Sequence, residues 1–150
     1  MPVTSLCDPK VVPGCPTRPA EIVDLNLLRQ ARGQRADRRG REAENLAADA
    51  LATDGWEVLA RRLRTPAGEI DLVAERDGIV AFVEVKGRPT LSQAAYALDL
   101  RQRRRLGAAA EIALAEHPTW GRHGARFDVM LVDGAGRVRR VAGAFDLDAA

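Results

Sequence analysis

The sequence predicts a single mixed α/β domain: a central sheet of about five strands flanked by helices, in the order helix, three strands, helix, two strands. Apolar residues recur at helical spacing in two segments, and they alternate in the segments between and after these two. A two-residue turn signal, Asp77–Gly78, joins two of the alternating segments into a hairpin. A chain of 150 residues is long enough for one such domain and its core.

The N-terminal part of the chain differs in composition from the rest. Residues 1–35 contain five prolines and little apolar periodicity, so they cannot bury enough surface to offset their loss of conformational entropy. We therefore expect a flexible tail over residues 1–35, in which residues 22–31 could form a short helix. Residues 36–150 are expected to form the folded domain.

A first helix is predicted over residues 38–54. Alanines and leucines from Ala43 to Leu51 recur three and four positions apart, and Gly55 favours a C-terminal stop.

Three strands are predicted next, over residues 56–64, 67–75 and 79–86. Asp77–Gly78 lies between the second and the third strand, and both residue types tolerate the positive φ angles of a type I′ turn. These two strands should therefore form a tight antiparallel hairpin.

The C-terminal part is predicted to add one helix and two strands. Alanines and leucines at helical spacing predict a helix over residues 92–116, which Pro118 ends. Alternating apolar residues over 127–131 predict a fourth strand, and a fifth is predicted over residues 137–141.

Arginine supplies almost all of the positive charge, because only two of the 23 basic residues are lysines. The arginines of residues 29–41 are accompanied by a single acid, Asp37, and those of residues 101–105 by none. Planar guanidinium groups suit phosphate, so nucleic acid is a natural partner for both clusters. The alternative is a general use of arginine at solvent-exposed positions, and charge alone leaves it open.

Other composition features narrow the class of protein. Cys7 and Cys15 have no histidine near them that would complete a metal site. The chain has no apolar run of the roughly 20 residues that a membrane span needs. We expect a cytoplasmic protein without a membrane partner.

The hairpin places chemically active residues together. If the turn has two residues, Arg76 pairs with Ile79, so Asp71 should face Glu84 and Glu69 should face Lys86. Side chains alternate along a strand, so all four should point to one face, with Val80 and Phe82 extending that face away from the site. The opposite face carries apolar residues: Ile70, Leu72, Ala74, Ala81, Val83 and Val85.

Two carboxylates directly opposite each other destabilise a strand pair unless a cation lies between them. Mg²⁺ or Mn²⁺ is the expected cofactor, because hard divalent cations take oxygen ligands and retain several waters. Lys86 could then orient or deprotonate an attacking water, or stabilise charge on a phosphorane. The alternative is a cross-strand ion pair between Glu69 and Lys86, with Asp71 and Glu84 facing solvent.

Three blocks carry a family resemblance: residues 68–74 (GEIDLVA), 82–88 (FVEVKGR) and 126–129 (RFDV). Together they resemble the YraN family of predicted endonucleases, relatives of the archaeal Holliday-junction resolvases. The resemblance covers residues 38–146 and implies a restriction-endonuclease-like core of the PD-(D/E)xK type.

The resemblance also implies roles for individual residues. Asp71, Glu84 and Lys86 would bind metal and act on water. Resolvase-like relatives add a glutamate on the first helix, and Glu44 occupies that place, so it is expected to assist catalysis and metal binding. Such relatives commonly act as dimers, and a homodimer is therefore possible for this chain.

Two positions depart from the family pattern. Ala43 stands where a glycine usually precedes the helix glutamate, and Gln102 stands where the second helix usually has a lysine. The second departure removes a phosphate contact that flanking arginines could replace. The residues expected to contact nucleic acid are Arg41, Arg88, Arg101, Arg103 and Arg104. For Asp128, an ion pair with Arg126 or Arg88 is the favoured role.

The sequence therefore predicts a metal-dependent nuclease that hydrolyses DNA phosphodiester bonds, with branched or structured DNA as a candidate substrate. The alternative is a non-catalytic nucleic-acid-binding module of the same fold, in which the carboxylates are vestigial.

Overall fold

The computed structural model describes residues 25–88 and 98–145. Its elements follow the predicted order. They are α1 (Leu25–Thr53), β1 (Glu57–Thr65), β2 (Gly68–Arg76), β3 (Ile79–Gly87), α2 (Leu100–Glu116), β4 (Gly124–Val132) and β5 (Val138–Phe145). The part of the expected tail before residue 25 lies outside the described residues.

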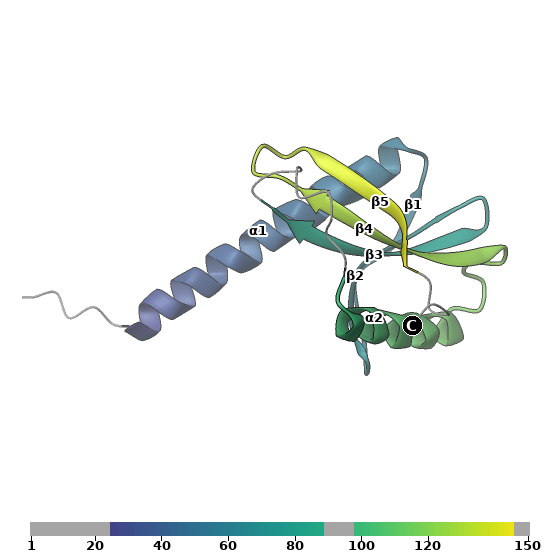
Figure 1. Ribbon diagram of the computed structural model, residues 1–150, viewed down its shortest axis with the longest axis horizontal. Helices are drawn as coiled ribbons and strands as arrows, with labels where there is room; N and C mark the ends of the chain where they lie inside the picture. The colour runs from purple at the N-terminus through teal and green to yellow at the C-terminus, as the bar shows by residue number, and fades with distance from the viewer. Residues whose placement is uncertain (1–24, 89–97, 146–150) are drawn as a thin grey trace, which may run out of the picture.

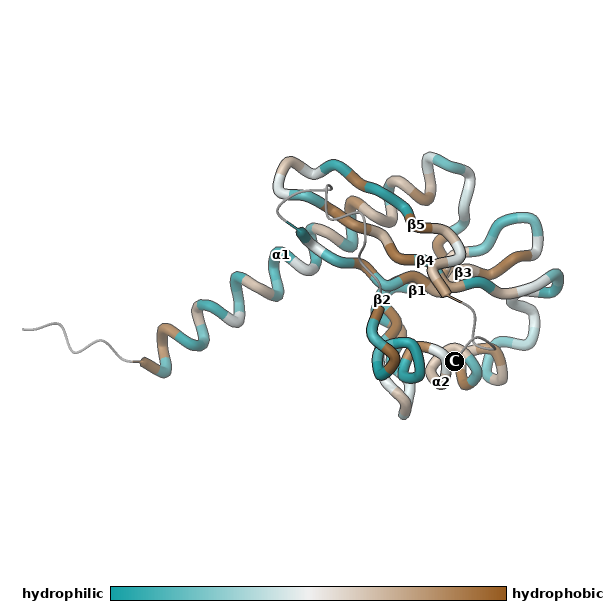
Figure 2. The backbone as a smooth tube through the Cα atoms, in the orientation of Figure 1, coloured by the Kyte–Doolittle hydropathy of each residue, from teal (hydrophilic) through white to brown (hydrophobic). Residues whose placement is uncertain are grey.

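One mixed sheet of five strands, in the order β1-β2-β3-β4-β5, forms the middle layer. Among the described strands, β3 and β4 are the only neighbours that pair in parallel, and α2 lies between them in the chain. Helix α1 packs on one face and α2 on the other, so the predicted α/β class is confirmed (Figure 1). Figure 2 shows the hydrophobic residues gathered in the central strands, which both helices cover.

The two helices differ from their predicted bounds. Helix α1 begins at Leu25, not at residue 38, and its first half extends away from the sheet (Figure 1). Leucine, arginine, glutamine and alanine favour helix here although no apolar stripe marks one. Helix α2 begins at Leu100, because extended Asp99 caps it: Asp99 Oδ1 accepts from the amide of Gln102 at 2.8 Å. Residues 92–97 of the predicted range lie outside the described residues.

Strand β5 continues to Phe145, four residues beyond its predicted end at 141. The ring of Phe145 stacks on that of Phe127, with ring centroids 4.7 Å apart, and this contact holds the end of the strand against the sheet. Among the described residues, no helix is both long and apolar enough to cross a bilayer.

The β2–β3 hairpin has the predicted turn and register. Asp77 and Gly78 have φ angles of 53° and 77°, as a type I′ turn requires, and Arg76 pairs with Ile79. The ladder then runs without a shift to the pair Leu72–Val83.

Replacement of Gly78 by alanine should lower the free energy of unfolding by about 1–2 kcal/mol, because an L-residue is strained at this positive φ. The added Cβ would also lie 2.6 Å from Nδ1 of His123. Gly33→Ala is the matched control: it lies in α1 with open space around it, so it should be neutral or stabilising by up to about 1 kcal/mol. Urea denaturation of both variants measures the difference, and equal stabilities would contradict this account of the turn.

Candidate functional site at the fork between β2 and β3

Strands β2 and β3 separate beyond the pair Leu72–Val83, where their ladder ends. From there β2 continues its pairing with β1 as far as Gly68, and β3 continues with β4 as far as Gly87. The two halves of the sheet thus form a fork, and the fork opens at Asp71. Ile70 then packs in the cluster under α2, not on the α1 side with Leu72 as strict alternation predicted.

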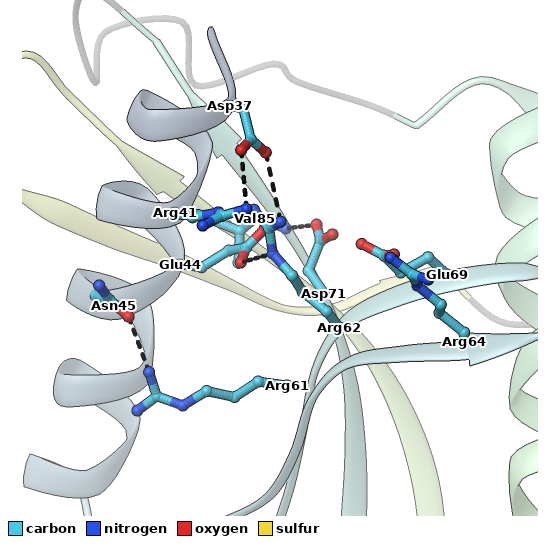
Figure 3. Close-up of polar contacts among 10 residues, drawn as sticks. All are labelled: Asp37, Arg41, Glu44, Asn45, Arg61, Arg62, Arg64, Glu69, Asp71 and Val85. Carbon is cyan, nitrogen blue, oxygen red and sulfur yellow. Dashed lines mark hydrogen bonds and ion pairs between the residues drawn. The ribbon is translucent and has the colours of Figure 1, made fainter. Parts of the chain in front are cut away.

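Asp71 bridges the fork with its carboxylate. Its Oδ2 accepts a hydrogen bond from the backbone amide of Val85 at 2.8 Å (Figure 3). The carboxylate takes the position of a ladder partner that β2 no longer supplies. Asp71–Glu84 and Glu69–Lys86 are therefore not the ladder pairs that the hairpin register predicted, because β2 has already left β3 at this point.

Glu84 lies on β3 beside Asp71, and its side chain is only 8% exposed. Its Oε1 is 3.2 Å from Nζ of Lys86 and 3.5 Å from an Nη atom of Arg105. Its Oε2 is buried and has no hydrogen-bond partner among the described residues. One oxygen of this carboxylate is thus held by two cations, and the other is left without a partner.

Glu44 approaches the fork from α1 and is held by an arginine of β1. Nε of Arg62 is 2.7 Å from Oε2 of Glu44, and a further Arg62 nitrogen is 3.5 Å from Asp37 (Figure 3). Arg62 has a φ of 47°, which is rare for a side chain of this size and breaks the regular course of β1 opposite Asp71. At this irregular position of β1, the Arg62 side chain extends to Glu44 on α1.

The electrostatics of the fork are unfavourable without a cation. Burial, and after it the charge of Glu84, raise the pKa of Asp71 to about 7, against the lowering effects of the Val85 amide and Lys86. The charge of Glu44 is a smaller contribution to the same rise in the pKa. A carboxyl group that is partly protonated at neutral pH indicates a site that lacks positive charge.

The residues present fit a divalent cation with two protein carboxylates. The unpartnered Oε2 of Glu84 and the Asp71 carboxylate are hard oxygen donors, and such cations take their remaining ligands from backbone carbonyls, waters or phosphate. Among the described residues, no three acidic, histidine or cysteine side chains are grouped to hold a metal. Glu44 was expected to be a further metal ligand. It lies near the two carboxylates, but its side chain is held by Arg62 instead.

The structure brings together four of the predicted site residues: Glu44, Asp71, Glu84 and Lys86. Glu69 is not part of this group. It lies 3.6 Å from Arg64, so the alternative ion pair with Lys86 is not formed.

Sequence reasoning missed two arginines of the site, Arg62 and Arg105. Each contacts an acid of the fork. Arg62 had no signal in the strand pattern. Arg105 had one: it lies four positions before Ala109 and eight before Ala113, so it shares the buried face of the helix with these alanines.

The arginines expected to contact nucleic acid differ in their surroundings. Arg101 and Arg104 are exposed on α2, whereas Arg103 donates to the carbonyl of Leu98 at 2.9 Å and lies over the ring of Phe145. Arg41 is 65% exposed and lies 3.0 Å from Asp37. The half-buried Arg88 donates its backbone amide to β4 directly after β3.

Asp128 is fully buried on β4 and has a structural role. It accepts hydrogen bonds from Arg126, from Arg140 and from the amide of Gly143. Both guanidinium groups lie over the ring of Trp56. The predicted ion pair with Arg126 is confirmed, and Arg140 takes the place proposed for Arg88.

A cleft of about 880 Å³ lies between α1 and the ends of β3 and β4. Its lining includes Ala43 and Gly87, which are neighbours in the chain of Glu44 and Lys86. Glu44, Asp71, Glu84 and Lys86 are not among its lining residues, so this cleft is a feature separate from the fork.

Comparisons with known proteins agree on one family. The model of the uncharacterised protein family UPF0102 matches residues 43–132. A UPF0102 protein of Granulibacter bethesdensis is 62% identical over 117 residues, which are 78% of this chain and 74% of that protein. A UPF0102 protein of Azorhizobium caulinodans is 50% identical over 117 residues, covering 78% and 89% of the two chains. A third, from Acidiphilium cryptum, is 52% identical over 106 residues, covering 71% and 83%. The chain belongs to the UPF0102 family, which is the YraN family that its motifs resemble.

Proposed function

We propose that this protein is a divalent-metal-dependent endonuclease that hydrolyses phosphodiester bonds of DNA. The observation that carries the proposal is the fork itself, where Asp71 and Glu84 converge beside Lys86 and leave one buried carboxylate oxygen without a partner in residues 25–88 and 98–145. A protein that folds for stability alone gains nothing from a buried, unpartnered oxygen.

The side chains of the fork would have different roles in the reaction. Asp71 and Glu84 would hold Mg²⁺ or Mn²⁺, which when bound polarises the phosphate and lowers the pKa of water. Lys86 is held 3.2 Å from Glu84 and so is placed to orient the attacking water or to stabilise the negative charge that develops on the phosphorane. Glu44 keeps Arg62 at the α1 side of the site.

Arginines on both sides of the fork support a DNA substrate. The outer half of α1 carries exposed Arg29, Arg32, Arg35, Arg38 and Arg39, and it leads to Arg41 and Arg62 beside the fork. On the other face α2 presents Arg101 and Arg104. A duplex that reaches the fork would place its phosphates along these groups, because guanidinium ions bind phosphate in a sequence-independent way.

A non-catalytic nucleic-acid-binding module of the same fold is the second candidate. The arginines of α1 and α2 serve it equally well, whereas the raised pKa of Asp71 and the unpartnered Glu84 oxygen have no role in it.

Purified protein with Mg²⁺ or Mn²⁺ should cleave labelled linear or branched DNA, and Lys86→Ala should lose this activity by at least about a hundredfold. Lys10→Ala, which changes the one other lysine, is the matched control and should cleave normally. DNA binding by Lys86→Ala, measured in Ca²⁺, should stay within a few-fold of wild type. Salt-dependent binding without cleavage by the wild-type protein would favour the non-catalytic module.

Asp71→Asn should raise the melting temperature of the metal-free protein, increasingly so as the pH rises. The folded-state pKa of about 7 lies above the ordinary value of 3.8, so wild-type stability falls as pH rises between these values and then levels off. Asparagine has no such charge and can still accept from the Val85 amide. Melting curves in EDTA from pH 4 to pH 8 measure the trend, and a variant stabilised equally at every pH would refute it.

Added Mg²⁺ should make the wild-type protein melt at a higher temperature than Asp71→Asn at pH 8, because ligand binding stabilises only the protein that binds it. The wild type should gain less at pH 6, where Asp71 retains its proton, and Asp71→Asn should gain little at either pH.

Replacing Arg32 and Arg35 together by glutamine should weaken DNA binding and lower the slope of log K against log salt by about one to two. Both residues are exposed on α1, and glutamine keeps the helix. The matched control replaces Arg76 and Arg122, exposed arginines at the hairpin-turn end of the sheet, and so removes the same charge. Fluorescence anisotropy at several salt concentrations measures the slopes, and equal slopes for the two double variants would show that α1 makes no phosphate contacts.

A further inference from the structure

Arg105 differs from the other arginines of its run because its side chain lies across the start of β2. One Nη donates to the backbone carbonyl of Glu69 at 2.9 Å, and the other lies 3.5 Å from Oε1 of Glu84. The guanidinium group thus joins the two arms of the fork, since Glu69 belongs to β2 and Glu84 to β3. Arginine suits this position because its planar group presents two donors in a fixed geometry.

A glycine makes room for this side chain. A Cβ at Gly68 would lie 3.1 Å from Cγ and from an Nη atom of Arg105, which is closer than ordinary van der Waals contact. Gly68 also has a φ of 143°, a conformation that other residues rarely adopt. Gly68 and the Glu69 carbonyl together form a seat that fixes Arg105 from two sides.

The position of Arg105 matters for Glu84 because the two oxygens of the Glu84 carboxylate have different surroundings. Lys86 and Arg105 both hold Oε1, so the side chain has a fixed orientation, and this orientation leaves Oε2 buried and without a partner in the part of the chain that the structure describes. We infer that Arg105, seated on Gly68, is a positioning residue that fixes the metal-binding oxygen of Glu84 and thereby makes the site select Mg²⁺ over Ca²⁺. This inference rests on the metal site of the proposed function.

A fixed orientation of the Glu84 carboxylate should affect the selectivity between Mg²⁺ and Ca²⁺. Mg²⁺ demands near-ideal octahedral geometry with short bonds, whereas Ca²⁺ accepts six to eight oxygens in flexible arrangements. A Glu84 side chain that Lys86 alone holds is less firmly oriented, so it can still bind Ca²⁺, by one or both oxygens, but it holds Mg²⁺ less well. Loss of Arg105 also removes a positive charge near the cation, and this change favours both ions equally. The ratio of the two affinities therefore isolates positioning from charge.

The experiment measures Mg²⁺ and Ca²⁺ affinities of the full-length protein by calorimetry without DNA. Arg105→Gln should lower the ratio of Mg²⁺ affinity to Ca²⁺ affinity on the order of tenfold, as is typical for loss of a group that orients a metal ligand. Arg105→Lys keeps the charge but cannot reach both Glu69 and Glu84, so it should restore little of the ratio. Arg104→Gln is the matched control, since it removes the same charge from an exposed position of α2, and its ratio should equal that of wild type.

A second variant should lower the Mg²⁺ to Ca²⁺ affinity ratio without replacing Arg105. Gly68→Ala should displace the Arg105 side chain and lower the ratio as well, and melting curves in EDTA report whether each variant is folded. A Mg²⁺ to Ca²⁺ ratio in folded Arg105→Gln that equals the wild-type ratio would overturn the inference, because Arg105 would then act only through its charge. A wild-type protein that binds neither ion would instead overturn the proposed metal site, and this inference with it.

Discussion

The separation of β2 from β3 after the Leu72–Val83 pair is the constraint on which the rest of the site depends. A strand that leaves its neighbour exposes backbone amides, and these need partners when they lie inside a fold. The Asp71 carboxylate supplies one to Val85, so the residue that opens the fork also closes its hydrogen-bond ladder. This bond lowers the pKa of Asp71, yet burial and Glu84 outweigh it.

Positive side chains reach the acids of the fork from three elements. Lys86 comes from β3 and Arg105 from α2, and both contact Oε1 of Glu84, whereas Arg62 comes from β1 and contacts Glu44. Their charges compensate the carboxylates only in part, because one Glu84 oxygen has no partner within the described residues and Asp71 keeps a raised pKa. An arrangement that is incomplete in this way is typical of a site prepared for a ligand, and it opposes stability in the ligand-free protein.

The two helices provide much of the surroundings of the fork. Helix α1 covers one face with its C-terminal half, through Ala43, Ala47 and Leu51, and its N-terminal half carries exposed arginines beyond the sheet. Helix α2 packs beneath the other face and carries Arg105 to β2, while its capping box uses Gln102. The position at which the family usually has lysine thus has a structural use in this chain, at the first turn of α2.

The sequence by itself determined the order of elements, the turn at Asp77–Gly78 and the register of the hairpin as far as the pair Leu72–Val83. These features are local, because turn chemistry and the alternation of side chains act between residues close in the chain. It also identified Asp71, Glu84, Lys86 and Glu44 as a group. Only the tertiary structure decided where the strands part and which arginines reach the acids. Those outcomes depend on the packing of β1 and α2 against β2, between segments far apart in the chain, and no local pattern encodes such contacts.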